Sequence, residues 1–165
     1  MASFHGELHR IQQALKRGLF KKVDHAGSAD ELLELAASMQ REGSAPHAAI
    51  CLRAAAQCQK ALDNPSVVAH HETQAGQLLW REELQVALIS NVDDSVFREF
   101  VPEATSCYLS AIKIHVTHEH WSLAGALYAD MADFLWALGT PASHTSATFL
   151  SARGLVLLLG VELLR

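Results

Sequence analysis

Three histidines stand close together in the stretch "KIHVTHEHW". His115 and His118 are three residues apart, so they share one face of a helix, and His120 follows two residues later. Zinc commonly binds such pairs, but a zinc site needs a third or fourth ligand and hydrogen bonds that orient the ligands. We expect a polar helix end that runs into a turn, and a small zinc-dependent enzyme or zinc-binding module is the alternative.

A second candidate is a pair of thiol and imidazole groups. His47, Cys51 and Cys58 follow one another at spacings of four and seven residues, which places them along one helical face. A cysteine nucleophile needs a base within hydrogen-bond reach, and this spacing permits one. The same spacing also describes a packed helix face, where cysteine behaves as a small apolar residue. We expect the packed face.

The remaining polar residues offer weaker candidates. The adjacent His70 and His71 point in different directions on a helix, and the scattered carboxylates are expected on solvated faces. No Gly-rich phosphate loop, nucleophile elbow or paired acidic motif occurs in the sequence. We therefore predict that the chain is not an enzyme, that no residue is catalytic, and that it uses no cofactor and no metal.

The composition sets further bounds. A net charge of −5 argues against a nucleic-acid partner, because binding of phosphates needs clustered basic residues. Three cysteines, an odd and low number, favour reduced thiols in a cytoplasmic setting. The strongest apolar run, Leu155–Val161, is far too short to span a bilayer, so we expect a soluble protein.

The elements that position these residues are predicted to be helices, since long segments follow a helical period and none alternates at period two. Ser28 with Glu31 has the pattern of a capping box, so we expect a helix to start there after Gly27 ends the previous one. Seven helices joined by short turns are expected, with an all-α fold of antiparallel hairpins. The predicted single domain, 1–165, comprises a basic N-terminal helix (1–25), a first hairpin (28–62), a second hairpin with a long connection (65–118) and a third hairpin (119–160).

Spaced small residues suggest an irregular tetratricopeptide-like solenoid. Such a repeat pairs two helices over about 34 residues, with large and small residues at fixed offsets. Leu35–Ala36, Ala75–Gly76 and Ala124–Gly125 repeat one offset, and Ala104 and Ala111 repeat the spacing of Ala48 and Ala55. Small residues at crossings allow backbones to approach, so each pair can stack on the next. Trp121 and Tyr128 are assigned to the core, and an ordinary alanine-rich bundle is the alternative.

Three surfaces are predicted to bind partners. The stretch "LKRGLFKK" is basic and amphipathic, and it suits an acidic partner surface or an anionic lipid surface. The concave side of a repeat stack is the second. The apolar C-terminal end lacks the polar face of a terminal repeat, so we expect more protein or a partner to cover it. The candidate residues are Lys16, Arg17, Lys21 and Lys22 for the basic stretch, Gln40, Arg41, Gln74, Gln77 and Arg81 for the concave side, and Leu155, Leu158 and Leu159 for the end.

The order of several motifs resembles the N-terminal half of the forty-kilodalton huntingtin-associated protein family. The features are "P-x-AA-x-C" and "A-x-C-Q-x-AL" within Ser38–Leu62, the run "AGQLLWREE", the basic "ALKRGLFKK", and the alanine-rich "AGALYADMADFLWALGTPA". The similarity covers about residues 8 to 150, and the tail from Leu150 is only loosely alike.

This resemblance implies a helical solenoid, akin also to vesicle-fusion attachment proteins, that acts as a non-catalytic adaptor. Its implied partner is huntingtin, a large HEAT-repeat protein that stabilises it. A link to early endosomes through a small Rab GTPase is also implied, with a cytoplasmic and nuclear location. A free-standing peptide-binding tetratricopeptide domain is the alternative, although we find no clamp for a terminal carboxylate in the sequence.

Overall fold

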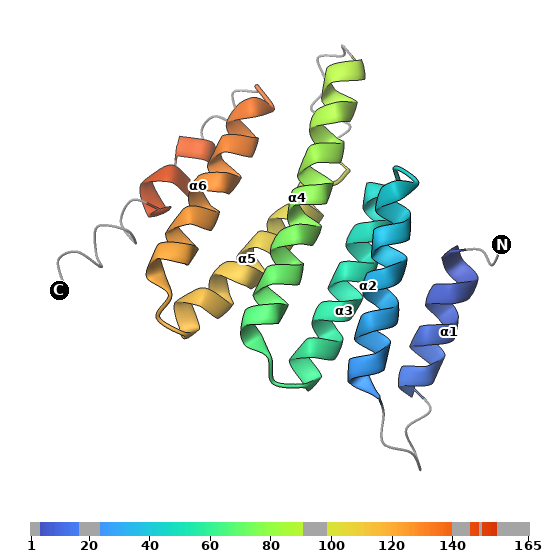
Figure 1. Ribbon diagram of the computed structural model, residues 1–165. Coiled ribbons are helices and arrows are strands. Elements are labelled where there is room, and N and C mark those ends of the chain that lie inside the picture. The colour runs from blue at the N-terminus through green and yellow to red at the C-terminus, as the bar shows by residue number, and fades with distance from the viewer. Residues whose placement is uncertain (1–3, 17–23, 91–98, 140–145, 149, 155–165) are drawn as a thin grey trace. The chain divides into compact units, whose positions relative to one another are not determined.

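The computed structural model describes residues 4–16, 24–90, 99–139, 146–148 and 150–154. Helices account for all the regular structure in these ranges, which confirms the all-α, solenoid-like fold of antiparallel hairpins (Figure 1). A short helical segment at 146–148 and 150–154 follows the last numbered helix. The numbered helices are α1 (Phe4–Lys16), α2 (His25–Arg41), α3 (Ala45–Ala61), α4 (Pro65–Ser90), α5 (Val101–Thr117) and α6 (Trp121–Ala137).

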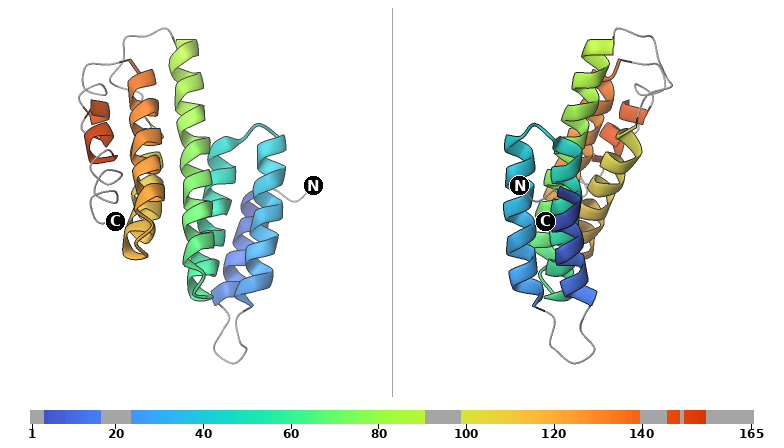
Figure 2. Two further views of the ribbon diagram at one scale, coloured as in Figure 1. Left: turned by 60° about the vertical axis from the view of Figure 1, so that its left-hand side comes forward. Right: turned by 90° about the vertical axis from the view of Figure 1, so that its right-hand side faces the viewer.

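Two compact units divide the chain, Met1–Ala75 and Gly76–Arg165, and α4 contributes residues to both. In the first unit, α2 and α3 run side by side in opposite directions (Figures 1 and 2). α1 packs on α2, where it buries Ile11. In the second unit, α5 and α6 form another antiparallel pair. The predicted single domain over residues 1–165 stays a prediction.

The helices follow a regular spacing along the chain. α2, α3, α5 and α6 are each 17 residues long. α2, α3 and α4 begin twenty residues apart, and so do α5 and α6. Each hairpin is therefore longer than the ideal tetratricopeptide pair of about 34 residues.

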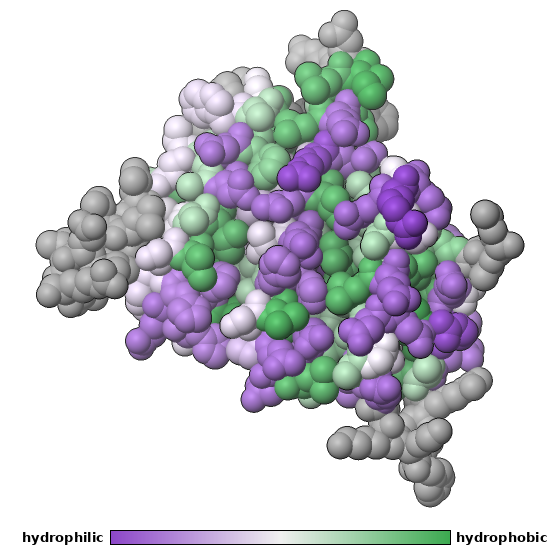
Figure 3. Space-filling model, in the orientation of Figure 1, coloured by the Kyte–Doolittle hydropathy of each residue, from purple (hydrophilic) through white to green (hydrophobic). Residues whose placement is uncertain are grey.

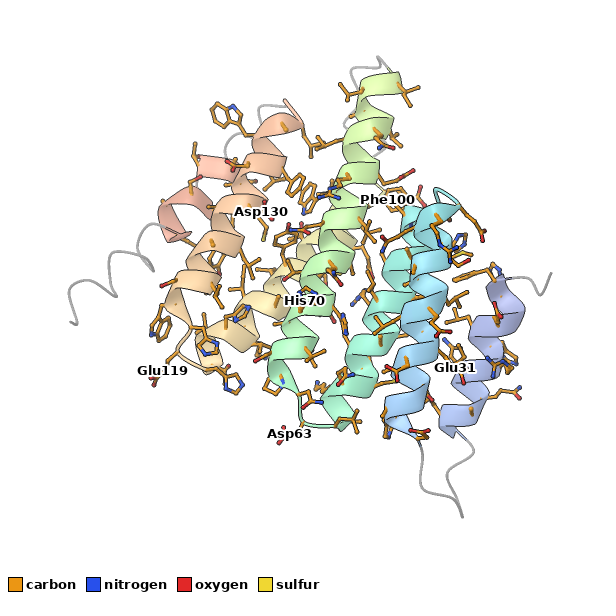
Figure 4. The ribbon with its side chains drawn as sticks, in the orientation of Figure 1. Glu31, Asp63, His70, Phe100, Glu119 and Asp130 are labelled. Atoms are coloured by element: carbon orange, nitrogen blue, oxygen red, sulfur yellow. The ribbon has the colours of Figure 1, made fainter. Side chains whose placement is uncertain are left out.

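The turns that produce this spacing share one geometry. After α2, Gly43 has a φ of 75°, and the amide of Ser44 donates to the carbonyl of Met39 at 2.8 Å. This is the Schellman arrangement, in which a left-handed residue lets the chain satisfy the last helical carbonyls. Asp63 and Glu119, labelled in Figure 4, take the same left-handed conformation in the turns after α3 and α5.

α3 and α5 share a sequence pattern, and its two copies start 56 residues apart in the chain. The pattern Pro-x-Ala-x-x-Cys-(Leu/Tyr)-x-x-Ala begins at Pro46 and again at Pro102. Both prolines lie in the first turn of their helix, where the missing N–H has no intrahelical partner to lose. The small residues of both copies are fully buried, as close packing of these helices requires: Ala48, Cys51 and Ala55 in α3, and Ala104, Cys107 and Ala111 in α5.

A crossing at which glycine is needed lies between α4 and α5. A Cβ atom at Gly76 would lie 2.6 Å from Cδ2 of Tyr108 and 3.2 Å from the carbonyl oxygen of Ala104. Tyr108 is itself fully buried, and so is Trp80, which stacks on Phe134 with ring centroids 5.6 Å apart. The core of the second unit is therefore built from large rings placed against small residues.

Two sequence expectations are corrected by the structure. α2 begins at His25 and not at Ser28, because Asp24 is its N-cap and its carboxylate accepts a 2.9 Å hydrogen bond from the amide of Gly27. Gly27 and Ser28 therefore lie inside the first turn of α2, and the N-terminal helix does not extend to residue 25. Trp121 is half-exposed and not a core residue, whereas Tyr128 is buried as expected.

We predict that Gly76→Ala lowers the free energy of unfolding by about 1–2 kcal/mol, because the strain against the Tyr108 ring exceeds the gain in helix propensity. Gly6→Ala is the matched control, since Gly6 is an exposed residue of α1. That substitution should stabilise the protein by up to about 1 kcal/mol. Urea unfolding followed by circular dichroism measures both. Equal stabilisation by the two substitutions would show that the α4–α5 crossing is not tight.

Candidate partner-binding surfaces

The residues predicted to bind partners fall into three groups. Gln40 and Arg41 are exposed at the end of α2, and Gln74 is half-buried on α4 in the same unit. Gln77 and Arg81 lie on α4 in the second unit. The other candidates are not described by the structure: the side chain of Lys16, and the residues Arg17, Lys21, Lys22, Leu155, Leu158 and Leu159. A partner-binding role for all of them stays a prediction.

Gln77 and Arg81 lie beside a buried polar pair. The hydroxyl of Tyr108 donates a hydrogen bond to the carboxylate of Asp130, which links α5 to α6. Burial, together with this bond and the charge of Asp130, holds the pKa of Tyr108 well above its ordinary value of 10.0. A hydrogen bond from Gln77 and the positive charge of Arg81 act in the opposite direction. Gln77, half-buried on α4, thus lies close to the Tyr108 hydroxyl.

The three clustered histidines do come close together at the turn between α5 and α6. The rings of His115 and His120 have centroids 5.8 Å apart, and those of His118 and His120 are 6.2 Å apart. Burial and the two neighbouring imidazoles lower the pKa of His115. Among the described residues, no group of three or more His, Cys, Asp or Glu side chains is arranged to hold a metal ion.

The thiols of α3 are buried, as the packed-face interpretation predicted. Cys51 is fully buried, and burial raises the pKa of its thiol from 9.0 to about 11. Burial also raises the pKa of Cys58. A nucleophilic cysteine needs the opposite shift, toward the thiolate. The half-buried His47 instead has its Nδ1 2.6 Å from the hydroxyl oxygen of Ser44. The centroid of its ring lies 4.3 Å from the centroid of the Phe4 ring.

Three polar residues of α4 are buried, although carboxylates were expected on solvated faces. Glu72 is 4% exposed, with Oε2 3.6 Å from Nε of Arg53 on α3. Glu83 is 3% exposed, and it accepts a 2.9 Å hydrogen bond from the amide of Phe100 just before α5 (Figure 4). Both glutamates share a helical stripe with the buried Leu79, at spacings of seven and four residues. This helical spacing is the one feature of the sequence that could have indicated their burial.

His71 is the third buried polar residue. It is 7% exposed, whereas the adjacent His70 is exposed; neither ring nitrogen makes a hydrogen bond of good geometry, and the nearby side chain of Gln74 partly offsets the effect of burial on the pKa of His71. The different directions expected for the two rings are therefore confirmed. Burial lowers the pKa of His71 below its ordinary value of 6.5, because the charged form loses its hydration.

An apolar groove of about 630 Å³ opens in the second unit between α5, α6 and the helical segment 146–154. Leu109, 44% exposed, belongs to this groove. Among the described residues that line it, Arg153 carries a charge, and its guanidinium carbon lies 5.4 Å from the centre of the Tyr128 ring. The described residues that line it are Val101, Thr105, Leu109, Tyr128, Met131, Leu135, Ser146, Leu150 and Arg153.

A second apolar surface lies at the end of α4. Leu88 and Ile89 are each 82% exposed, and Val86 is 39% exposed. Figure 3 shows these apolar side chains gathered around the last turns of the helix. α4 has 26 residues, so this tip is the part that exceeds the common helix length of 17.

Comparison with known proteins gives a distant relationship. The 40-kDa huntingtin-associated proteins of Rattus norvegicus and Mus musculus are each 26% identical to this chain over 140 residues, which is 85% of the chain. The chain spans about a third of the length of these relatives, 36%. No family model matches the sequence. In the described part of the chain, no helix has both the length and the apolar character to cross a membrane.

We predict that His71→Leu makes the protein less sensitive to acid. The unfolded chain takes up this proton first as the pH falls, because the folded-state pKa of His71 lies below 6.5. Above pH 6.5 the ring is neutral in both states, so His71 does not reduce the free energy of unfolding. That free energy falls as the pH drops through 6.5 toward the folded-state pKa of His71, because only the unfolded chain then binds the proton. The loss reaches at most about 1.4 kcal/mol per pH unit for one histidine.

The measurement is urea unfolding between pH 7.5 and about pH 5, above the range in which most carboxylates titrate. His71→Leu should give a shallower slope of unfolding free energy against pH than the wild type. His70→Leu, which changes the exposed neighbour, should keep a slope close to that of the wild type. Identical slopes for all three proteins would contradict a buried, neutral His71.

Proposed function

We propose that this chain is a non-catalytic helical-repeat adaptor that binds huntingtin, a large HEAT-repeat protein. The observation that carries the proposal is the 26% identity to the 40-kDa huntingtin-associated proteins, which extends over 85% of the chain. A match over 140 residues is too long to be due to one short motif. The name of these relatives associates them with huntingtin, and the proposal extends that association to this chain.

The described surface is compatible with this role. Nine large apolar side chains are more than a third exposed, among them Leu88, Ile89 and Trp136. Contiguous apolar surface on a soluble protein commonly marks an interface. Hairpins of equal length joined by identical turns also present their exposed positions at regular intervals, as helical-repeat binding proteins do.

The finer parts of the proposal concern location and further partners. We propose that the adaptor acts in the cytoplasm, that it associates with early endosomes through a small Rab GTPase, and that it also enters the nucleus. These parts rest on the motif resemblance alone. Fluorescence microscopy of the tagged chain beside an early-endosome marker tests the location.

We predict that the chain co-purifies with full-length huntingtin when both are expressed together, and that its melting temperature rises in the complex. Saturation at 100 times Kd stabilises a protein by about 2.7 kcal/mol, which corresponds to roughly 5–10 °C for a chain of this size. Affinity purification and differential scanning fluorimetry measure the two effects.

The mouse 40-kDa huntingtin-associated protein serves as the positive control in the same preparation. If that control is captured and this chain is not, the proposed function is wrong for this chain. A stable chain with the same melting temperature in both conditions would favour the peptide-binding alternative.

A further inference from the structure

A second pocket of the second unit, here called the α6 pocket, lies between α6 and the helical segment 146–154, which neighbour each other in Figures 1 and 2. Its volume is about 500 Å³. The described residues that line it are Ala132, Asp133 and Trp136 on α6, and Ala147, Thr148, Ser151 and Ala152 on the segment. None of these residues lines the apolar groove, so the α6 pocket is a separate surface.

The segment 146–154 repeats the sequence pattern of α5. The small or apolar residues Ala104, Cys107 and Ala111 of α5 correspond to Ala147, Leu150 and Gly154, each 43 residues later. Ala147 is 2% exposed, and a Cβ atom at Gly154 would lie 3.0 Å from the carbonyl oxygen of Gly125 on α6. The segment thus crosses α6 closely through small residues, as α5 crosses α4.

α4 and α6 are related by the shift of 56 residues, because α4 begins at Pro65 and α6 at Trp121. Under these two shifts, the described lining of the α6 pocket corresponds to the residues of α4 and α5 around their crossing. The pairs on the first helix are Gly76 with Ala132, Gln77 with Asp133, and Trp80 with Trp136. The pairs on the second are Ala104 with Ala147, Thr105 with Thr148, Tyr108 with Ser151, and Leu109 with Ala152.

At the crossing of α4 and α5, aromatic rings fill the space. The ring of Tyr108 lies against Gly76, and Phe134 of α6 stacks on Trp80 with ring planes 4° apart. The hydroxyl of Tyr108 donates a hydrogen bond to Asp130 of α6. α6 therefore covers this face with two side chains that are four residues apart, the carboxylate of Asp130 and the ring of Phe134.

The α6 pocket has the same aromatic platform, but it is open. Trp136 is 56% exposed, whereas its counterpart Trp80 is fully buried. The exposed Ser151 stands where α5 has Tyr108, so one ring is missing from the space between the helices. A ring from outside that stacks on Trp136, as Phe134 stacks on Trp80, fits this space.

Charge at the aligned positions indicates the second contact. Gln77 and Arg81 of α4 lie beside the Tyr108 hydroxyl that bonds to Asp130. Their counterparts on α6 are Asp133 and Ala137, so an exposed carboxylate replaces the amide and an alanine replaces the cation. A helix that covers the α6 pocket therefore needs a cation where α6 has Asp130, because Asp133 would repel a carboxylate there.

We propose that the α6 pocket binds an α-helix of a partner protein, and that this helix presents an arginine or lysine and, four residues later, an aromatic side chain. The ring stacks on Trp136, and the cation pairs with Asp133. The small lining residues Ala132 and Ala147 let the backbone of the helix approach, so the helix continues the stack as α6 continues it from α4 and α5. The identification of the partner as huntingtin rests on the proposed function, whereas the chemistry of the pocket does not.

The first experiment uses a synthetic helix with the sequence of α6, Trp121–Ala137, as the probe, because α6 covers the equivalent face. The arginine peptide carries Asp130→Arg, and the aspartate peptide keeps the α6 sequence. Isothermal titration calorimetry with the full chain should show at least tenfold tighter binding of the arginine peptide, and Phe134→Ala in that peptide should weaken it at least tenfold. Equal affinities of the arginine and aspartate peptides, or no binding of either, would overturn the proposal.

Matched variants of the protein locate the binding site. Trp136→Ala should weaken binding of the arginine peptide at least tenfold, whereas Trp121→Ala should change it less than twofold. Trp121 is the control because it is a half-exposed tryptophan of the same helix that does not line the pocket. Circular dichroism confirms that both variants are folded, and equal effects of the two substitutions would contradict the assignment to this pocket.

The charge pairing is tested by Asp133→Lys. This variant should bind the aspartate peptide more tightly than the arginine peptide, which reverses the preference of the wild type. Glu119→Lys, which changes an exposed carboxylate in the turn before α6, should keep the wild-type preference. An unchanged preference in Asp133→Lys would refute the pairing.

Other occupants are tested with a photo-crosslinking residue at position 151. Irradiation in the presence of the arginine peptide should link this position to the peptide. A link formed without the peptide, to residues 155–165 of the same chain or to a second copy, would show that the protein itself fills the pocket and would overturn the proposal.

With huntingtin as the partner, Asp133→Lys should weaken the complex at least tenfold. A complex that forms normally with this variant would refute the pocket as the huntingtin interface and leave the proposed function intact. Failure of the wild type to bind huntingtin, with binding of the arginine peptide preserved, would refute the proposed function and leave the pocket.

Discussion

The close approach of helices through small residues is the constraint on which both units depend. Alanine buries little apolar area, so it stabilises a helix pair mainly by letting the neighbouring backbone and larger side chains come near. At Gly76 the space for even one methyl group is absent, because the ring of Tyr108 fills it. The same ring then reaches Asp130 on α6 with its hydroxyl. One small residue on α4 thus determines where a large residue of α5 lies and which polar group of α6 it can meet.

Tight packing also explains why polar groups inside the units are tied to specific partners. Burial of a carboxylate is unfavourable unless it accepts hydrogen bonds or pairs with a cation. Glu83 accepts a bond from the amide of Phe100, beside the N-terminus of α5, where the helix dipole favours a negative charge. Glu72 has Arg53 within 3.6 Å. His71 differs, since neither ring nitrogen makes a hydrogen bond of good geometry and its neutral form is the one that burial favours.

Much of the fold was predictable from the sequence because its signals are local. Alanines and cysteines at helical spacing, prolines in first turns and glycine in a turn identified α3 and the packed faces correctly. The predicted start of α2 was wrong because two capping patterns occur within five residues. Asp24, four residues before Ser28, is the one that caps the helix. Burial of Glu72, Glu83 and His71 could not be read from residue type, since it depends on which helix packs against that side of α4. The apolar groove was missed for the same reason: its lining comes from three segments, and no one of them has an unusual pattern.

Because the chain contains an internal repeat, two copies of one packing face can be compared within the same molecule. Two copies of one packing face, 56 residues apart, experience the same requirements from their helices and turns. Where the copies agree, as at Ala48 and Ala104, the shared residue is explained by helix crossing alone. Elsewhere the copies differ: the paired Arg53 of the first copy is matched by the half-exposed Leu109, and its partner Glu72 is matched by Tyr128. An ion pair of the first copy is thus replaced by two uncharged side chains at the aligned positions of the second.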